Sequence, residues 1–164
     1  MTAYPFVPKS SQLLRPGDFW AIPLRDGSFA CGCVVELMPK GIPGARVGFL
    51  GGLLDWHANI LPTPESVRDA GFVSQGTMHI RAIISTGGTI LGHRETPVDV
   101  WTFIHGDKIQ KGFTFVRPWS RDDNKRLPTY SVWGYDVIQI KANRHFLDGL
   151  PSFGEAFRKR YAEH

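Results

Sequence analysis

The stretch LRPGDFWAIPLRDGSFACGCVVEL, residues 14–37, contains two apolar runs joined by Asp26 and Gly27. An Asp-Gly pair between apolar runs is the strongest short-range indication of a β-hairpin, and it favours a type I′ turn, in which both central residues have positive φ. We therefore predict one strand over residues 19–24 and a second over residues 28–37. A lone hairpin is marginally stable in water, so other elements must pair with it or cover it.

The second predicted strand carries both cysteines of the chain, Cys31 and Cys33. Alternate side chains of a strand share a face, so the thiols lie on one face with Phe29, Val35 and Leu37, while the small residues opposite leave room for a closely packed group. Two cysteines placed this way strain a disulfide, and reduced thiols are typical of the cytosol. We therefore expect both cysteines to be reduced, buried and inert.

Turn-forming residues recur along the rest of the chain, which has 18 Gly and 12 Pro in 164 residues. This composition indicates many short strands separated by tight turns. Besides the hairpin, we predict strands over residues 46–54, 76–86, 98–104, 113–117 and 134–142.

Two helices are also predicted. A short helix in the middle of the chain has Thr63 as its N-cap and Pro64 at its first position, and it ends at Gly71. A second helix is C-terminal and amphipathic, because apolar residues recur there at intervals of three and four. These residues are Leu150, Phe153, Phe157 and Tyr161.

The order of strands and helices predicts an α+β fold. We expect a mostly antiparallel, strongly bent sheet of about seven strands, with a short mid-chain helix and a C-terminal amphipathic helix that covers an open face. The length favours a single domain over residues 1–164, with residues 1–12 as a loose N-terminal arm. A domain of this size folds without a metal or a disulfide.

The sequence also predicts where the protein works. No stretch approaches the ~18 apolar residues of a membrane span, and residues 1–14 lack an apolar core of signal-peptide length. Apolar residues make up 42% and charged residues 21% of the chain, which is ordinary for a globular protein. Together with reduced cysteines, these features predict a cytoplasmic protein that does not bind membranes.

Motifs for catalysis or cofactor binding are missing from the sequence. It contains neither a phosphate-binding loop that ends in Lys and Ser/Thr nor a Gly-x-Ser-x-Gly serine elbow. His93 and Glu95 form a His-x-Glu triplet, but the cysteines precede it and lack the spacing of a zinc deaminase. The six histidines show no metal-ligand spacing. We predict no catalytic residue, no metal and no cofactor.

The polar loop that follows residues 113–117 is the clearest candidate for a binding surface. It combines a tryptophan with both signs of charge, and binding residues are often carried on loops. Exposed charges contribute little to folding, so reversing both aspartates of this loop to Lys is expected to leave stability nearly unchanged. We predict that the partner is contacted by Trp119, Arg121, Asp122, Asp123, Lys125 and Arg126.

The net charge is mildly positive, with 19 Lys and Arg against 15 Asp and Glu. The basic residues are interleaved with acidic ones, as in SRDDNKR, residues 120–126. A surface that binds nucleic acid instead concentrates Lys and Arg. We therefore predict that nucleic acid is not a partner.

The hairpin resembles the N-terminal signature of the immunity protein 26 family of bacterial polymorphic toxin systems. The matching positions are Gly17, Asp18, Phe19 or Trp20, Ile22, Pro23, Leu24, Asp26, Gly27, Phe29, Gly32 and Val34. The stretch GYDVI, residues 134–138, is similar to one that tends to end the sheet in this family. The resemblance implies an α+β, cytoplasmic, non-enzymatic protein that binds and neutralises a cognate toxin. A basic protein of this kind suits an acidic or neutral toxin.

Two other classes of function stay open. The positive charge and the aromatic content are also compatible with a small β-barrel that binds nucleic acid. Alternatively, scattered residues such as His93, Glu95 and His105 assemble an enzyme site in the folded chain.

Overall fold

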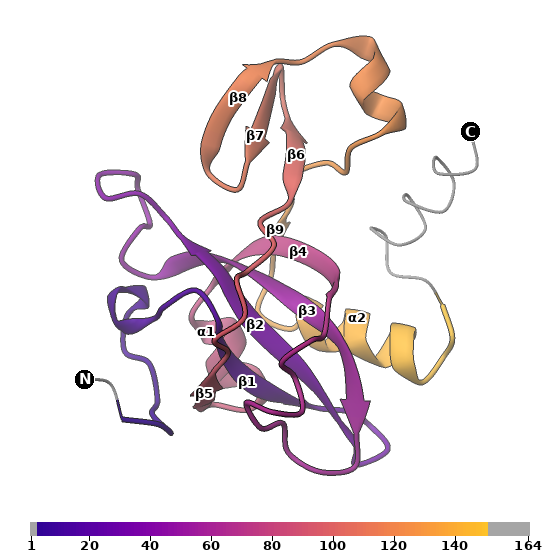
Figure 1. Cartoon of the computed structure of the whole chain (residues 1–164). Helices are drawn as coiled ribbons and strands as arrows, with labels where there is room; N and C mark the ends of the chain where they lie inside the picture. Colours follow the sequence, from indigo (N-terminus) through magenta and orange to yellow (C-terminus); the bar gives the residue numbers. More distant parts are fainter. Residues whose placement is uncertain (1–2, 151–164) are drawn as a thin grey trace.

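The computed structural model describes residues 3–150 and has an α+β fold, as the sequence predicts (Figure 1). The elements in chain order are η1 (Ser11–Leu13), β1 (Asp18–Pro23), β2 (Phe29–Leu37), β3 (Gly48–Ala58), β4 (Phe72–His79), α1 (Arg81–Thr86), β5 (Ile90–His93), β6 (Thr102–His105), β7 (Lys108–Lys111), β8 (Thr114–Pro118), η2 (Arg121–Lys125), β9 (Val132–Trp133) and α2 (Val137–Phe146). They form one six-stranded sheet, ordered β5-β1-β2-β3-β4-β9, and one three-stranded sheet, ordered β6-β7-β8. All neighbouring strands are antiparallel except β4 and β9, and the sheets do not close into a barrel.

The predicted hairpin is present, but its turn is not of type I′. Strand β1 pairs with β2 from Phe19 opposite Cys33 to Pro23 opposite Phe29. Of the turn residues only Gly27 has a positive φ, at 86°. The amide of Gly27 donates to the carbonyl of Leu24 at 3.0 Å, which leaves Gly27 as the single left-handed residue after an ordinary turn. The loop is therefore one residue longer than the two-residue loop of a type I′ hairpin. It needs a positive φ at one residue only, which is Gly27.

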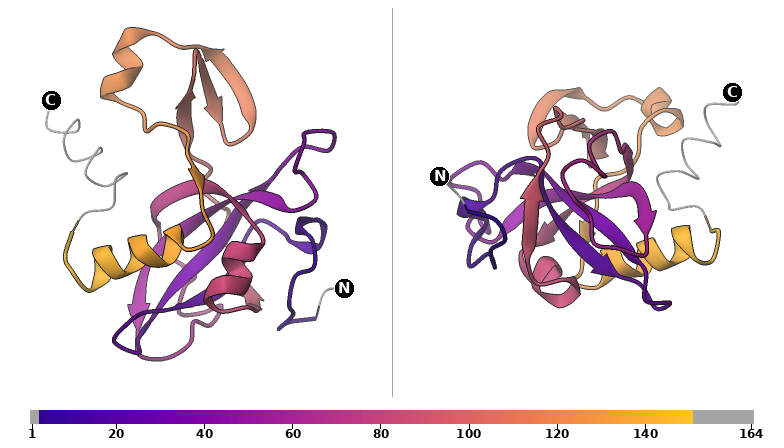
Figure 2. Two further views of the ribbon diagram at one scale, coloured as in Figure 1. Left: turned by 180° about the vertical axis from the view of Figure 1, so that it is seen from behind. Right: turned by 60° about the horizontal axis from the view of Figure 1, so that its bottom comes forward.

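The face of the hairpin with small side chains is the centre of the main core. A Cβ atom at Gly32 would collide with the indole of Trp20, which confirms that a group packs closely there. The core on this face also includes Ile83 of α1 and Ile138 and Ala142 of α2. Seen from behind, the two helices lie across this face of the large sheet (Figure 2).

The opposite face of the large sheet holds two smaller apolar clusters. In one of them Phe19, Cys31 and Cys33 pack against Leu54 and Val67. In the other, two sheet residues pack against the segment that leads into β6. Its buried members are Val35, Leu50, Trp101 and Phe103. The three-stranded sheet is therefore attached to the large sheet through a shared apolar cluster, and it projects from that sheet in Figure 1.

The mid-chain helix predicted after Thr63 is wrong, because residues 64–69 form turns. The guanidinium of Arg94 donates to the carbonyl oxygens of Arg68 and Ala70, both at 3.0 Å. The local backbone hydrogen bonds from Arg68 to Glu65 and from Ala70 to Val67 span three residues, as in isolated turns, and not the four residues of an α-helix.

Two regions predicted as strands form helices in the structure, one of them in part. The strand expected over residues 76–86 begins earlier as β4 and is followed by α1, and the strand expected over residues 134–142 is replaced by α2. In α2 the buried residues Ile138 and Ala142 are four positions apart, which places both on one face of a helix. Strands β5, β7 and β9 were not predicted. The C-terminal helix expected from Leu150 to Tyr161 lies, beyond Leu150, outside the described residues.

The N-terminal segment, expected to be a loose arm, is docked from Tyr4 onward. The backbones of Phe6 and Ile90 exchange two hydrogen bonds, at 3.0 and 2.8 Å. The Tyr4 hydroxyl donates to the buried carboxylate of Asp18 at 2.6 Å. The expectation failed because the partners of this segment are more than ten residues away in sequence, beyond the reach of a local pattern.

Both cysteines are free and fully buried, in agreement with the sequence analysis. Burial raises the pKa of the Cys31 thiol well above its ordinary value and that of Cys33 to about 12. The thiolate is the reactive form, so neither sulfur is a nucleophile near neutral pH.

We expect each Cys→Ala replacement at Cys31 or Cys33 to lower the free energy of unfolding by about 1 kcal/mol at neutral pH through lost packing. In the unfolded chain both thiols ionise near pH ~8.5. The unfolded state then holds fewer protons than the native state, so the parent protein loses stability as the pH rises above this value. The double Ala variant should show a shallower loss, measurable by urea unfolding at several alkaline pH values. Rapid labelling of the native thiols by a maleimide would contradict this account.

Candidate protein-binding surface

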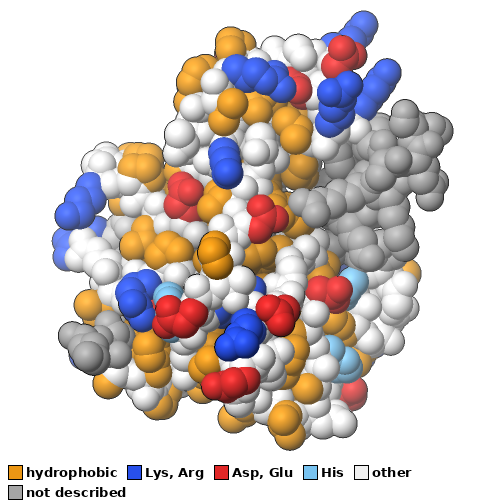
Figure 3. Space-filling model, in the orientation of Figure 1, with side chains coloured by type: hydrophobic (Ala, Val, Ile, Leu, Met, Phe, Trp, Pro, Cys, Tyr) orange, Lys and Arg blue, Asp and Glu red, His pale blue; other side chains and the backbone are white. Residues whose placement is uncertain are grey.

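Residues 102–126, which we call the outer unit, comprise β6, β7, β8 and η2. The outer unit carries six Lys and Arg against three Asp, and thus most of the net charge of +4 of the whole chain. The blue side chains that gather at the top of Figure 3 lie where Figure 1 places this unit. A concentration of one sign of charge attracts partners of the opposite sign and speeds their encounter.

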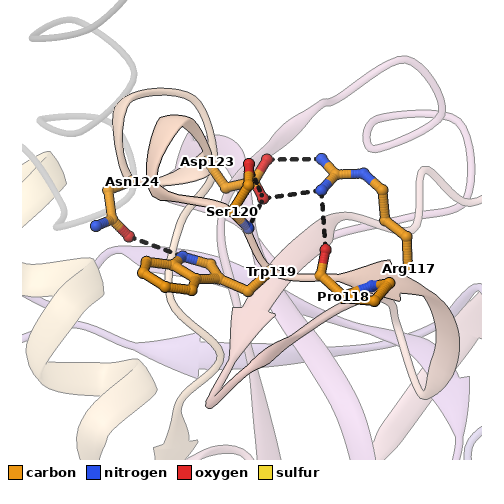
Figure 4. Close-up of polar contacts among 6 residues, drawn as sticks. All are labelled: Arg117, Pro118, Trp119, Ser120, Asp123 and Asn124. Atoms are coloured by element: carbon orange, nitrogen blue, oxygen red, sulfur yellow. Dashed lines mark hydrogen bonds and ion pairs between the residues drawn. The ribbon is translucent and has the colours of Figure 1, made fainter.

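An ion pair holds the loop that was predicted to bind the partner. Arg117 approaches the carboxylate of Asp123 with both terminal nitrogens, at 2.6 and 2.9 Å (Figure 4). The side chain of Asp123 is only 6% exposed. The hydrogen bonds from Arg117, followed by those from Ser120, hold the pKa of Asp123 far below its usual range. This carboxylate is therefore a structural anchor of the loop.

The same carboxylate also caps η2. The backbone amide of Ser120 donates to Asp123 at 2.8 Å, and the Ser120 hydroxyl lies 3.3 Å from it. Beside the cap, the indole nitrogen of Trp119 donates to the side-chain oxygen of Asn124 at 3.1 Å (Figure 4). The indole is thus held against η2 while the residue stays 39% exposed.

The six residues predicted to contact the partner fall into two groups. Asp123 is buried and internally paired, so replacing it by Lys is expected to unfold this loop, contrary to the prediction that both aspartates tolerate reversal. The other five are exposed, and among residues 3–150 the side chains of the four charged ones form no hydrogen bond or ion pair. These five are Trp119, Arg121, Asp122, Lys125 and Arg126.

Strand β8 adds apolar groups that the sequence analysis did not assign to the surface. All of its residues are exposed, including Phe115 at 58% and Val116 at 51%. Large exposed apolar side chains next to charged ones are typical of binding surfaces. The sequence predicted a strand here, but only the structure shows that its side chains are left exposed in the described chain.

A serine, a histidine and a carboxylate meet at the tip of the hairpin, where no sequence motif pointed. The Nε2 atom of His57 lies 2.6 Å from the Ser28 hydroxyl oxygen. That hydroxyl donates to Asp26, and this bond together with the Ser28 amide lowers the pKa of Asp26. In a catalytic triad the carboxylate instead binds the histidine, which takes the serine proton. Here the serine hydroxyl lies between the histidine and the carboxylate, which fits a role in stabilising the turn. Ser28 is also only 1% exposed, so its hydroxyl is closed to a substrate.

The two histidines suggested for a scattered enzyme site lie in different sheets, and Glu95 lies in the loop after β5. His93 in β5 binds Asp18 at 3.0 Å through Nδ1, whereas His105 in β6 binds the Gln110 side chain at 2.9 Å. Among the described residues, no group of three or more His, Cys, Asp or Glu side chains is arranged to hold a metal ion. Within the same part of the chain, no helix is long and apolar enough to cross a membrane.

No protein-family model matches the chain, and neither a curated protein nor a solved structure is significantly similar to it. Function is therefore inferred from the surface chemistry of the outer unit and from the resemblance carried by residues 17–34 and 134–138.

Proposed function

We propose that this chain is a cytoplasmic immunity protein that binds and neutralises a cognate bacterial toxin and has no catalytic activity of its own. The observation that carries the proposal is the outer unit. It presents Phe115, Val116 and Trp119 beside charged side chains that have no partner among residues 3–150. Interfaces combine aromatic anchors with a charged rim in this way.

The resemblance of the hairpin to the immunity protein 26 family supports the same proposal. The hairpin itself serves as the centre of the fold, because Trp20 and Gly32 are buried against each other in the main core. The partner-binding groups lie elsewhere, on the outer unit, which is free to vary without disturbing that core.

The charge of the outer unit predicts how the toxin is bound. We expect Arg121→Glu combined with Lys125→Glu to slow association with the toxin about tenfold at low salt, because exposed charges steer encounter. Asp122→Lys should speed association instead. Both variants should keep the parent melting temperature, because all three side chains are exposed and unpaired within the described chain. Stopped-flow mixing with the purified toxin measures the rates.

Growth rescue is the direct test of the proposed function. Co-expression with the toxin encoded beside the gene should restore growth, and purified toxin should bind the protein. Lys40→Glu, on the exposed loop between β2 and β3, is a matched control that should leave association unchanged. Failure of both rescue and binding would overturn the proposal, and an equal effect of Lys40→Glu would remove the outer unit from the interface.

A further inference from the structure

Strand β8 is an edge strand with one side unpaired. It is hydrogen-bonded to β7 on its inner side, and β7 separates it from β6. No described residue forms a strand along its outer side. Figure 1 shows this outer side at the margin of the outer unit. An edge of this kind displays backbone donors and acceptors on which an extended segment can pair.

The side chains of β8 are unusual for an unused edge. Proteins commonly protect edges with charges, prolines or bulges. Here the register shift between Ile109 and Gln110 places a bulge at Val116, and Pro118 ends the strand. The strand nevertheless exposes two adjoining apolar side chains at this bulge, Phe115 and Val116. A bulge interrupts the alternation of side chains and re-aims them, so an added strand would meet Phe115 and Val116 as an adjoining apolar pair.

The charges around β8 identify the partner as acidic. Lys108 and Lys111 on the neighbouring strand are exposed, as are Arg121 and Lys125 of η2. Asp123 does not offset them, because it is already paired with Arg117. Pairing of β8 with a second copy of this chain would bring two basic units together, which like-charge repulsion disfavours.

We propose that an extended acidic segment of the partner binds along the outer side of β8 as a fourth strand of the three-stranded sheet. The proposal rests on the proposed function in that the toxin supplies this segment. Backbone hydrogen bonds supply the affinity in this mode of binding, and alternating side chains supply the selectivity. Phe115 and Val116 select apolar side chains, while the surrounding Lys and Arg select carboxylates.

A synthetic peptide tests the proposal on the full chain without any toxin. The probe has about ten residues that alternate Val and Glu, and a matched control alternates Val and Lys. We expect the Glu peptide to bind about tenfold more tightly than the Lys peptide. It should also slow hydrogen exchange of amides within residues 114–117. N-methylation of alternate peptide amides should weaken binding about tenfold or more, because it removes backbone donors.

A pair of protein variants separates this site from other exposed apolar groups. Val116→Asp should weaken binding of the Glu peptide about tenfold by adding a like charge at the contact. Val132→Asp is the matched control, because Val132 is 72% exposed on β9, outside the outer unit. Its affinity for the peptide should stay close to that of the parent.

Several results would overturn strand addition. Three of them are equal binding of the Glu and Lys peptides, no effect of N-methylation on binding of the Glu peptide, and equal effects of the two Val→Asp variants on that binding. The fourth is tighter binding of a decathymidylate strand than of the Glu peptide at physiological salt. Toxin binding that survives Val116→Asp unchanged would overturn strand addition while retaining the proposed function. Peptide binding at β8 without growth rescue would retain the strand site and overturn the toxin as its partner.

Discussion

Trp20→Ala is expected to lower the free energy of unfolding by about 4 kcal/mol, because it truncates the largest of the fully buried side chains among residues 3–150. Trp20 covers Gly32 and meets the ring of Phe49 edge-on with centroids 6.1 Å apart. Its indole nitrogen donates to the Thr86 hydroxyl at 3.0 Å and so ties β1 to α1. The truncated side chain would leave a cavity in the centre of the sheet and a lost hydrogen bond beside it.

Urea unfolding followed by far-ultraviolet circular dichroism measures this loss. Trp119→Ala is the matched control, because Trp119 is 39% exposed and lies outside the three buried apolar clusters. It should lower the free energy of unfolding by less than about 1 kcal/mol. Equal losses for the two variants would show that the packing around Trp20 and Gly32 does not determine stability.

A double-mutant cycle tests the contact between Trp20 and Gly32 itself. In the parent protein, Gly32→Ala should destabilise by about 2 kcal/mol, because the new methyl group has no room beneath the indole. In the Trp20→Ala background the same change should have almost no effect. The difference is the coupling energy of the pair, and additive effects would contradict the contact.

Asp18→Ala is expected to lower the free energy of unfolding by about 3 kcal/mol. Asp18 is fully buried and accepts from the Tyr4 hydroxyl at 2.6 Å and the Arg15 amide at 2.9 Å. Its carboxylate also lies 3.0 Å from Nδ1 of His93. Truncation would remove this carboxylate from all three groups and release Tyr4 of the N-terminal segment from β1.

Two readouts distinguish this effect from general destabilisation. Trypsin should cleave after the exposed Lys9 faster in Asp18→Ala than in the parent under native conditions, because the segment that Tyr4 anchors is released. Tyr4→Phe removes one hydrogen bond and should lower the free energy of unfolding by about 1 kcal/mol. Asp122→Ala, an exposed control, should change it by less than about 0.5 kcal/mol. Unchanged trypsin cleavage in Asp18→Ala would mean that other contacts hold the segment.

The hairpin could be predicted from residues 14–37 without any knowledge of the rest of the chain. Alternation of side chains and the Asp-Gly turn are local features, so they assign both strands and the two faces of the second strand as far as Val35. A type I′ turn would pair Pro23 with Ala30, one residue away from the observed pairing with Phe29. The buried, unpaired state of Cys31 and Cys33 follows from the same alternation. Even the close approach over Gly32 was anticipated, although the residue that fills the space, Trp20, is identified only in the folded chain.

Short apolar runs elsewhere could not be assigned locally, because they satisfy the period of a strand and of a helix equally well. Residues 134–142 were predicted as a strand but belong largely to α2, since Ile138 and Ala142 find the open face of the large sheet. In the same way, residues 64–69 form turns where capping residues favoured a helix, and the carbonyls of residues 68 and 70 bind Arg94 from a distant part of the chain.

The binding surface shows the same division between local and long-range information. A loop at residues 119–126 with a tryptophan and both signs of charge was evident from composition and order alone. Only the tertiary structure buries Asp123 against Arg117 and places β8 at a free sheet edge, with Phe115 and Val116 exposed. Strand order and the pairing of buried charges depend on contacts between distant segments, and the local pattern of residues carries no record of which segments meet.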